Sequence, residues 1–296
     1  MKVIGFGDNI VDRFLDRQVM YPGGNCVNVA VFARRLGVEA AYLGVFGSDP
    51  LGAFVLDAVN AEGVDTSRCV IREGPNGVTE IKVVDGDRVF LGWNEGGVTT
   101  SDPFELEEEH LRYLASADLV HSSVYSASED QLPAVRGTEV LVSFDYSSEP
   151  EGRASAYLKQ TAPYVDLALL SCGNMTRVAV EHELKRVHAA GASLAVGTRG
   201  QSGAMMYDGE RFLTQPAAPT DAHRFADTMG CGDAFLAGLV VSLIGSGWSR
   251  RERPSGAALQ RALVRGSENA AEQCYVEGAF GHGRPVQVAT SRAGNN

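Results

Sequence analysis

Short apolar runs alternate with amphipathic segments over most of the chain. Such alternation is typical of a mainly parallel sheet that helices cover on both faces. The pattern predicts strands at residues 3–7, 40–46, 119–121, 140–144, 167–170 and 192–198. It predicts helices at residues 25–36, 51–61, 129–135, 154–161, 178–189, 233–243 and 257–274. We therefore expect an α/β fold.

One region interrupts this rhythm, because residues 67–98 carry no helical spacing. Residues 78–84 alternate apolar and polar positions, Asp85-Gly86 supplies a hairpin turn, and residues 88–91 return. A small antiparallel sheet of this kind, joined by the segment at 14–20, is typical of a lid or a dimerisation flap.

These patterns give the domain boundaries. We expect one domain over residues 1–283, with a β lid at about 10–22 and 67–98. Residues 284–296 are polar and aperiodic, so we expect a disordered tail there.

Charge and composition narrow the partners. A formal net charge of −11 argues against binding to nucleic acid or to an anionic membrane. No apolar run is long enough to span a bilayer, and the N-terminus has the pattern of a strand rather than of a signal peptide. The five cysteines are scattered without a C-x-x-C pair, which favours free thiols in a cytoplasmic protein.

The most specific chemical pattern is a small-residue turn that ends in a carboxylate at the start of a predicted helix. Gly230, Cys231 and Gly232 allow consecutive backbone N–H groups to converge, and the helix adds the positive end of its dipole. Asp233 would repel an anion held there unless it acts as a base on a hydroxyl while the turn stabilises a transferring phosphoryl group.

A second pattern near the N-terminus suits a polyol. Gly24 permits close approach of the backbone to a ligand, Asn25 can cap the helix, and Asn28 lies on the same face one turn on. Asp8 and Asp12 follow the first strand, where open parallel sheets bind their ligands. A plain glycine turn and an ordinary polar loop are the alternatives.

Three further patterns carry less information. Residues 198–203 form a Gly-x-x-Gly loop after a strand, which can lie under nucleotide phosphates. Asp49 with Pro50 has the chemistry of a helix cap, so a structural role is expected there. The six histidines show no metal-ligand spacing, and His121, which ends a strand, is expected to be structural.

Taken together, the Gly-Gly-Asn and Gly-Cys-Gly-Asp motifs resemble those of the ribokinase-type (PfkB) sugar kinases over nearly the whole chain. This resemblance implies a three-layer α/β/α Rossmann-like body with a small β lid, and MgATP as phosphoryl donor. By this resemblance Asp233 matches the base, and Gly230, Cys231 and Gly232 match the anion hole. The remaining residues match the sugar contacts (Asp8, Asp12, Gly24, Asn25, Asn28), the nucleotide contacts (Thr198, Gly200, Gly203, Asn269) and, at Asp227, a monovalent-cation segment for K⁺.

The chain departs from the family pattern at two positions. Cys231 replaces the usual alanine, which should preserve activity because only the backbone acts there. Arg177 stands where the family has the glutamate of an Asn-x-x-Glu motif linked to Mg²⁺ through water, so either the alignment slips or the metal environment differs.

Within the family, several stretches are similar to kinases that phosphorylate a ketosamine on its 6-hydroxyl, including the stretch that contains Arg88, which we include among the substrate-binding residues. A cationic amino-sugar would suit Glu95 in the lid. Two alternatives remain: a non-catalytic sugar or nucleotide sensor, and a nucleoside kinase whose aromatic cage would use Phe14, Tyr21 and Trp93. An exposed lid edge favours a homodimer.

Overall fold

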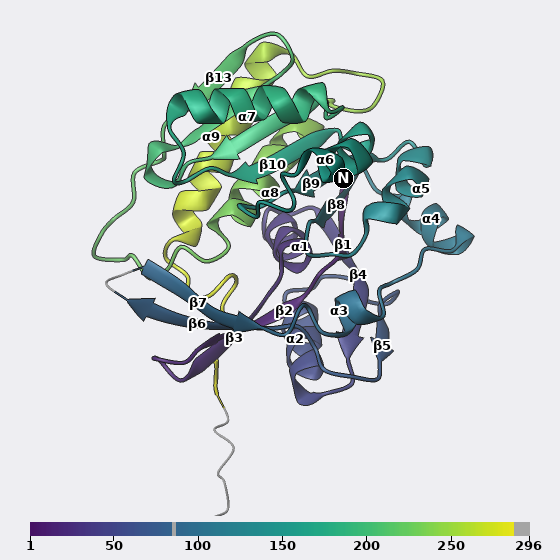
Figure 1. Ribbon diagram of the computed structural model, residues 1–296, viewed down its shortest axis with the longest axis vertical. Coiled ribbons are helices and arrows are strands. Elements are labelled where there is room, and N and C mark those ends of the chain that lie inside the picture. Colours follow the sequence, from purple (N-terminus) through teal and green to yellow (C-terminus); the bar gives the residue numbers. More distant parts are fainter. Residues whose placement is uncertain (85–86, 287–296) are drawn as a thin grey trace, which may run out of the picture.

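The computed structural model describes residues 1–84 and 87–286, without the side chains of residues 83, 84, 87, 88 and 90. A large body of sheet and helices lies against a smaller, separate sheet (Figure 1). The expected α/β body with a β lid is therefore confirmed. The predicted turn at Asp85-Gly86 and the tail at 287–296 lie outside the described residues.

Within the described residues, nine strands form the body sheet, in the spatial order β13-β12-β11-β10-β9-β8-β1-β4-β5. The strands from β11 to β5 pair in parallel, and β12 and β13 add an antiparallel edge. Their bounds are β1 Lys2–Gly7, β4 Glu39–Gly47, β5 Val70–Arg72, β8 Leu119–Ser123, β9 Leu141–Asp145, β10 Leu167–Ser171, β11 Leu194–Thr198, β12 Ala204–Tyr207 and β13 Phe212–Gln215.

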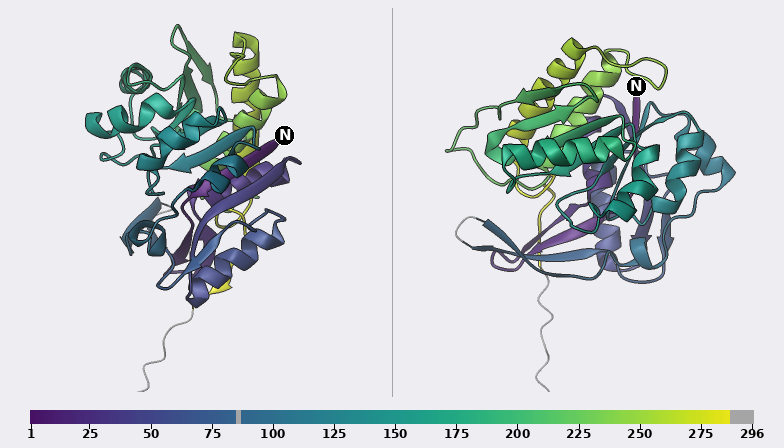
Figure 2. Two further views of the ribbon diagram at one scale, coloured as in Figure 1. Left: turned by 90° about the vertical axis from the view of Figure 1, so that its right-hand side faces the viewer. Right: turned by 45° about the horizontal axis from the view of Figure 1, so that its top comes forward.

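Alternate residues of each strand enter two separate cores, so helices cover both faces of the sheet (Figure 2). In β1, Val3 packs into the first core and Ile4 into the second. The first core lies under α1 (Asn25–Arg35), α2 (Pro50–Ala61), α8 (Cys231–Gly245) and α9 (Gly256–Gln273). The second lies under α4 (Glu108–Leu114), α5 (Leu132–Gly137), α6 (Ser155–Thr161) and α7 (Arg177–Ala189). The three-layer arrangement is thus confirmed.

The lid sheet has the order β14-β3-β2-β6-β7. Its strands are β2 (Ile10–Phe14), β3 (Val19–Gly23), β6 (Val78–Val84), β7 (Asp87–Trp93) and β14 (Arg284–Pro285). A small core of Phe14, Tyr21 and Ile81 joins the strands β2, β3 and β6.

Three details of the expected lid are wrong. The lid sheet is mixed, because β2 and β6 run in the same direction and pair in parallel. Residues 70–72 form β5 and extend the body sheet beside β4, so the lid segment begins later than residue 67. Ordered structure also passes residue 283, because β14 pairs with β3. The short helix α3 (Val98–Ser101) and helix α4 carried no signal that we recognised.

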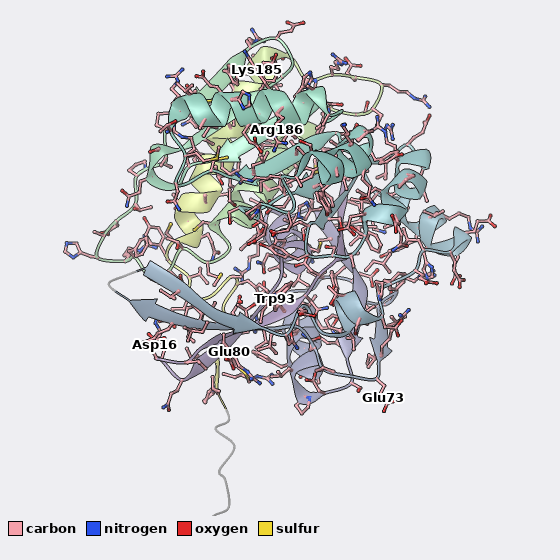
Figure 3. The ribbon with its side chains drawn as sticks, viewed as in Figure 1. Asp16, Glu73, Glu80, Trp93, Lys185 and Arg186 are labelled. Carbon is pink, nitrogen blue, oxygen red and sulfur yellow. The ribbon has the colours of Figure 1, made fainter. Side chains whose placement is uncertain are left out.

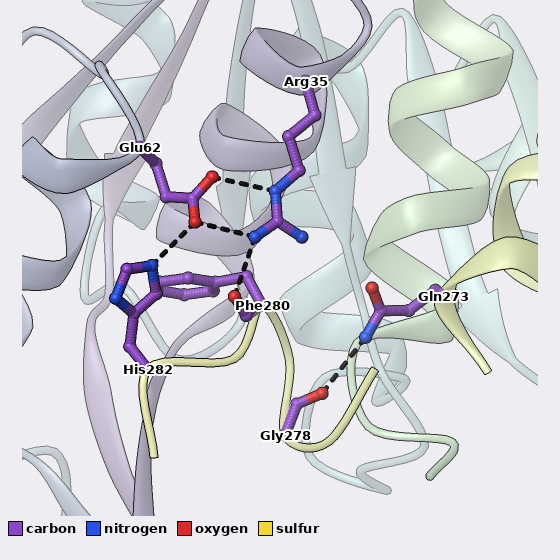
Figure 4. Close-up of polar contacts among 6 residues, drawn as sticks. All are labelled: Arg35, Glu62, Gln273, Gly278, Phe280 and His282. Atoms are coloured by element: carbon purple, nitrogen blue, oxygen red, sulfur yellow. Dashed lines mark hydrogen bonds and ion pairs between the residues drawn. The ribbon is translucent and has the colours of Figure 1, made fainter. Parts of the chain in front are cut away.

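The segment after α9 is fixed to the body by polar contacts (Figure 4). Arg35 of α1 forms a bidentate ion pair with Glu62 and donates to the carbonyl oxygen of Phe280 at 2.8 Å. His282 bonds to the same Glu62 carboxylate at 2.7 Å. Because these groups hold the segment on its way to β14, the end of the described chain is carried back to the lid.

Candidate active site

The candidate site lies at the carboxyl ends of β8, β9 and β1, which are neighbours in the body sheet. Asp8 follows β1, Ser123 ends β8, and Asp145 ends β9. The helices α1 and α8 pack against each other and begin at this same edge. Residues that lie far apart in the sequence therefore meet where open α/β sheets place their ligands.

Asp8 is the structural anchor of the site. Its Oδ1 accepts hydrogen bonds from the hydroxyls of Ser123 (2.7 Å) and Ser126 (2.9 Å). Its Oδ2 accepts the backbone N–H of Asn25 at 2.6 Å. Both oxygens of this buried carboxylate are thus already bonded to protein donors, which ties the end of β1 to α1 and to the loop after β8.

The expected cap of α1 is wrong in its detail. Gly24, with φ at 113°, is the N-cap, and Asn25 is already the first helical residue. Asp8 bonds the Asn25 N–H and so does the work of a capping side chain. A Cβ on Gly24 would lie 2.6 Å from the Cα of Asn9, so only glycine fits. The freed Asn25 amide donates to Asp145 at 2.7 Å.

Asp233 lies buried at the start of α8, and its Oδ2 accepts a hydrogen bond of 2.8 Å from the Asn28 amide. Burial raises the pKa of Asp233 well above its usual range, and the nearby Asp145 carboxylate raises it further. Asp8 and Asp12 add smaller contributions in the same direction. A carboxyl group with a raised pKa is a stronger base once it is ionised, which suits proton abstraction from a hydroxyl.

The turn before α8 has a left-handed residue at Gly230, with φ at 73°. The Cys231 N–H makes a long bond of 3.3 Å to the carbonyl oxygen of Thr228. Beside Gly232 there is open space where a Cβ would point. The amides at the start of a helix have no preceding turn to bond, so this turn has the donors that an anion needs.

Asp227 holds the backbone of the same turn through hydrogen bonds. Its Oδ1 accepts the backbone N–H groups of Thr228 (2.7 Å) and Met229 (3.1 Å). Its Oδ2 is buried and has no hydrogen-bond partner among the described residues. An oxygen of this kind fits a cation ligand.

Three of the four residues that we expect to contact the nucleotide lie at the end of β11 and in the loop after it. Thr198 ends that strand, and Gly200 (φ 52°) and Gly203 (φ 81°) enclose a short 3₁₀ turn. A Cβ on Gly203 would lie 2.0 Å from the carbonyl oxygen of Gln215, whereas Gly200 faces open space. Asn269 of α9 donates its amide to the carbonyl oxygen of Ala234 at 2.6 Å, so it links α9 to the first turn of α8.

The sequence did not reveal several residues that border the site. Asp145 accepts from Asn25, and burial raises its pKa to about 6. Tyr125 donates its backbone N–H to Ser123, and its hydroxyl bonds to Glu149 at 3.0 Å. The position of Asp145 at the end of an apolar strand was the available signal.

Four other expectations can be placed. Asp49 caps α2 by accepting the Gly52 N–H at 2.9 Å, as predicted. His121 is fully buried and bonds Ser143, and burial lowers its pKa to about 4, so it is a neutral residue of the sheet. Arg177 is paired with Glu181 at 2.9 Å at the start of α7. The side chain of Arg88 lies outside the described residues.

The comparisons with known proteins decide the family. The model of the pfkB family carbohydrate kinases matches residues 12–281. The chain belongs to this family. This kinase is 35% identical to the fructosamine kinase FrlD of Bacillus subtilis, over 97% of this chain and 96% of that protein. It is 31% identical to the fructoselysine 6-kinase of Escherichia coli, over 93% of this chain and 97% of that protein.

Solved structures support the fold of the kinase. A sugar kinase from Pyrococcus horikoshii superposes with a TM-score of 0.73 and 20% identity, covering 95% of this chain and 94% of the other. The aminoimidazole riboside kinase of Salmonella enterica gives a TM-score of 0.72 and 20% identity, covering 95% of each. The kinase is therefore an ATP-dependent sugar kinase with the ribokinase-like fold. None of the helices in the described part of the chain is long and apolar enough to cross a bilayer.

Proposed function

We propose that this cytoplasmic kinase transfers the γ-phosphoryl group of ATP to the 6-hydroxyl of a ketosamine, with Asp233 as the base. The observation that carries the base assignment is the buried Asp233 carboxylate, oriented by Asn28 at the turn before α8. The similarity to a fructosamine kinase and a fructoselysine 6-kinase supports the acceptor class.

In this mechanism Asp12, Asn25 and Asn28 orient the sugar so that its primary hydroxyl reaches Asp233. Asp8 holds the start of α1 in place and acts on the sugar mainly through Asn25. As the hydroxyl attacks in line, Asp233 takes its proton, and the amides of residues 230–232 stabilise the charge on the phosphoryl group. The loop from Thr198 to Gly203, together with Asn269, binds the nucleotide.

The proposed ions fit the site in different ways. Mg²⁺ neutralises phosphate charge when it is bound with ATP. Among the residues that the structure describes, no cluster of three acidic, histidine or cysteine side chains could hold a metal alone, so the triphosphate and water would supply most of its ligands. Arg177, which stands where the family has a glutamate, forms an ion pair with Glu181 on α7, so its guanidinium group is already paired. For K⁺, the unbonded buried oxygen of Asp227 is the proposed ligand.

An aromatic contact between the lid and the body, with a carboxylate beside it, supports a ketosamine acceptor. Trp93, on lid strand β7, lies where the lid faces the body (Figure 3) and packs edge-to-face on Tyr125 at 6.2 Å. Tyr125 in turn bonds Glu149 and, through Ser123, adjoins the Asp8 cluster. Aromatic faces beside a carboxylate favour an ammonium group such as the amine of a ketosamine.

Two of the three aromatic residues that a nucleoside cage would use weaken the nucleoside kinase alternative. Phe14 and Tyr21 are buried in the lid core and pack on each other, so they do not form a cage around an acceptor. The retained Asp233 weakens the sensor alternative, because a binder gains nothing from a carboxylate beside a phosphate site.

The acceptor class can be tested by following ADP release with fructoselysine, fructose and a nucleoside. We expect the highest kcat/KM with fructoselysine. Glu149→Gln should raise KM for fructoselysine about tenfold, the loss of roughly 1.4 kcal/mol, and leave KM for fructose unchanged. Glu151→Gln, at a neighbouring exposed carboxylate, is the control and should change neither value. A preference of the wild type for fructose or a nucleoside would refute the ketosamine assignment.

We also propose a homodimer formed through the lid. The outer strand β7 is an unpaired edge within the described residues and exposes Val89 and Leu91. Sedimentation at micromolar concentration should give twice the mass of 31.5 kDa. Leu91→Lys should shift the species toward a monomer, and a wild type that sediments as a monomer would exclude this arrangement.

A further inference from the structure

Two thiols meet beside the turn that precedes α8. The Sγ of Cys231 lies 3.6 Å from the Sγ of Cys274. Cys231 is the first residue of α8, and Cys274 is the C-cap of the neighbouring helix α9, which packs along α8 (Figure 1). Both residues are half-buried and unbridged. The pair therefore joins the C-terminal end of one helix to the proposed anion-binding turn.

We propose that Cys231 and Cys274 form a reversible disulfide that switches off phosphoryl transfer by displacing this turn. A disulfide bond is about 2.05 Å long, so the two sulfur atoms must approach by about 1.5 Å. Gly232, which follows Cys231, faces open space and leaves room for this movement, whereas Gly230, which precedes it, is packed against Ala279. Closure is thus a local change that leaves the packed helices in place.

The oxidant is a peroxide, and the chemistry needs no other reactant. One thiolate attacks hydrogen peroxide, becomes a sulfenic acid and releases water after proton transfer. The second thiol then displaces the sulfenic hydroxyl as another water and forms the S–S bond. One peroxide accepts the two electrons that the two thiols lose, and a dithiol such as dithiothreitol returns them by exchange.

The other cysteines lack this arrangement. Cys26 is fully buried and bonds the carbonyl oxygen of Phe6, and burial raises the pKa of its thiol. Cys69 bonds the carbonyl oxygen of Tyr42, and burial raises its pKa as well. Cys172 is buried in the second core. The thiolate is the reactive form, so oxidation should be selective for the pair at 231 and 274.

The bond would act on catalysis because Cys274 already holds the other end of the turn. Its carbonyl oxygen accepts the N–H of Ala226 at 2.8 Å and the N–H of Asp227 at 3.3 Å. The preceding Gln273 donates to the carbonyl oxygen of Met229 at 3.1 Å. A disulfide would therefore fix the turn at both ends and pull the 231 and 232 amides away from the phosphoryl group.

The experiment treats the full-length kinase with hydrogen peroxide and measures kcat and the cross-links. Loss of one donor to a developing oxyanion costs about 10²–10³-fold in kcat, so we expect the oxidised enzyme to lose at least about tenfold. Non-reducing peptide mass analysis should find the 231–274 cross-link, and dithiothreitol should remove it and restore kcat. The effect on kcat rests on the proposed role of the turn, whereas the cross-link does not.

Two variants make the test specific. Cys274→Ser should keep the basal kcat and resist peroxide, because its side chain lies outside the reaction path. Cys69→Ser should remain as sensitive as the wild type. If Cys274→Ser unfolds at a lower temperature, Cys274→Ala replaces it. The proposal is overturned by the absence of the cross-link, by an oxidised enzyme with unchanged kcat, or by equal inactivation of the wild type and the folded Cys274 variant.

Discussion

Asp233→Asn should lower kcat by about 10²–10⁴-fold, because the substitution removes a positioned base. Asparagine keeps the size of the side chain and an oxygen that can accept the Asn28 amide, which donates to Asp233 at 2.8 Å. The fold should therefore persist while proton abstraction is lost. Coupled measurement of ADP release, with acceptor and ATP both saturating, gives the comparison with the wild type.

Stability measurements separate this chemical loss from unfolding. The folded-state pKa of Asp233 is raised above its unfolded value, so the wild-type stability falls as pH rises from the ordinary aspartate range through the raised pKa. At pH 8 Asp233→Asn should unfold at the same temperature as the wild type or a higher one. Asp57→Asn, at an exposed carboxylate of α2, is the control and should keep full kcat. Near wild-type kcat in Asp233→Asn would disprove the base assignment.

Asp8→Ala should destabilise the protein by about 3 kcal/mol, because it leaves donors of buried groups without an acceptor. Its carboxylate bonds Ser123, Ser126 and the Asn25 N–H. Asp12→Ala should instead raise KM for the sugar about tenfold, the loss of one charged hydrogen bond worth roughly 1.5 kcal/mol. Its effect on stability should be smaller, because removing Asp12 also relieves its repulsion of Asp233.

Urea unfolding and steady-state kinetics on both variants test this division of roles. A reference is Glu210→Ala, at an exposed carboxylate between β12 and β13, which should change neither quantity. Equal losses of stability in Asp8→Ala and Asp12→Ala would show that the carboxylates share one structural role. A raised KM in Asp8→Ala without loss of stability would assign direct sugar binding to Asp8.

The body of the fold was predictable because its strands are buried on both faces and its helices are amphipathic. Both patterns are local, so the bounds of β1 and α1 differ from the predicted ranges by only one residue. The Gly-Cys-Gly-Asp turn could also be predicted, because the residues that such a turn needs follow one another directly in the sequence. The approach of Asn28 to Asp233 could be expected only from the family resemblance.

The parts that escaped prediction depend on contacts between distant segments. A two-stranded ribbon such as β6–β7 is visible in the sequence, but nothing in it reveals that β2 pairs with β6 in parallel. The sequence suggested that the side chain of Asn25 caps α1. In the structure the carboxylate of Asp8, 17 residues away, accepts the N–H group at the start of this helix. Asp145 directly follows a predicted strand, but only the structure shows that its charge raises the pKa of Asp233.

The pairing of β14 with β3 has a consequence for synthesis on the ribosome. Among the described strands, β3 is made before any body strand except β1, whereas Arg284 and Pro285, which pair with it, come after every other strand. A nascent chain ending before them would already hold every body strand but would present β3 as an open edge. The lid is therefore completed only after every strand of the body has been made, and a chain terminated between β13 and β14 would be left with a surface prone to aggregation.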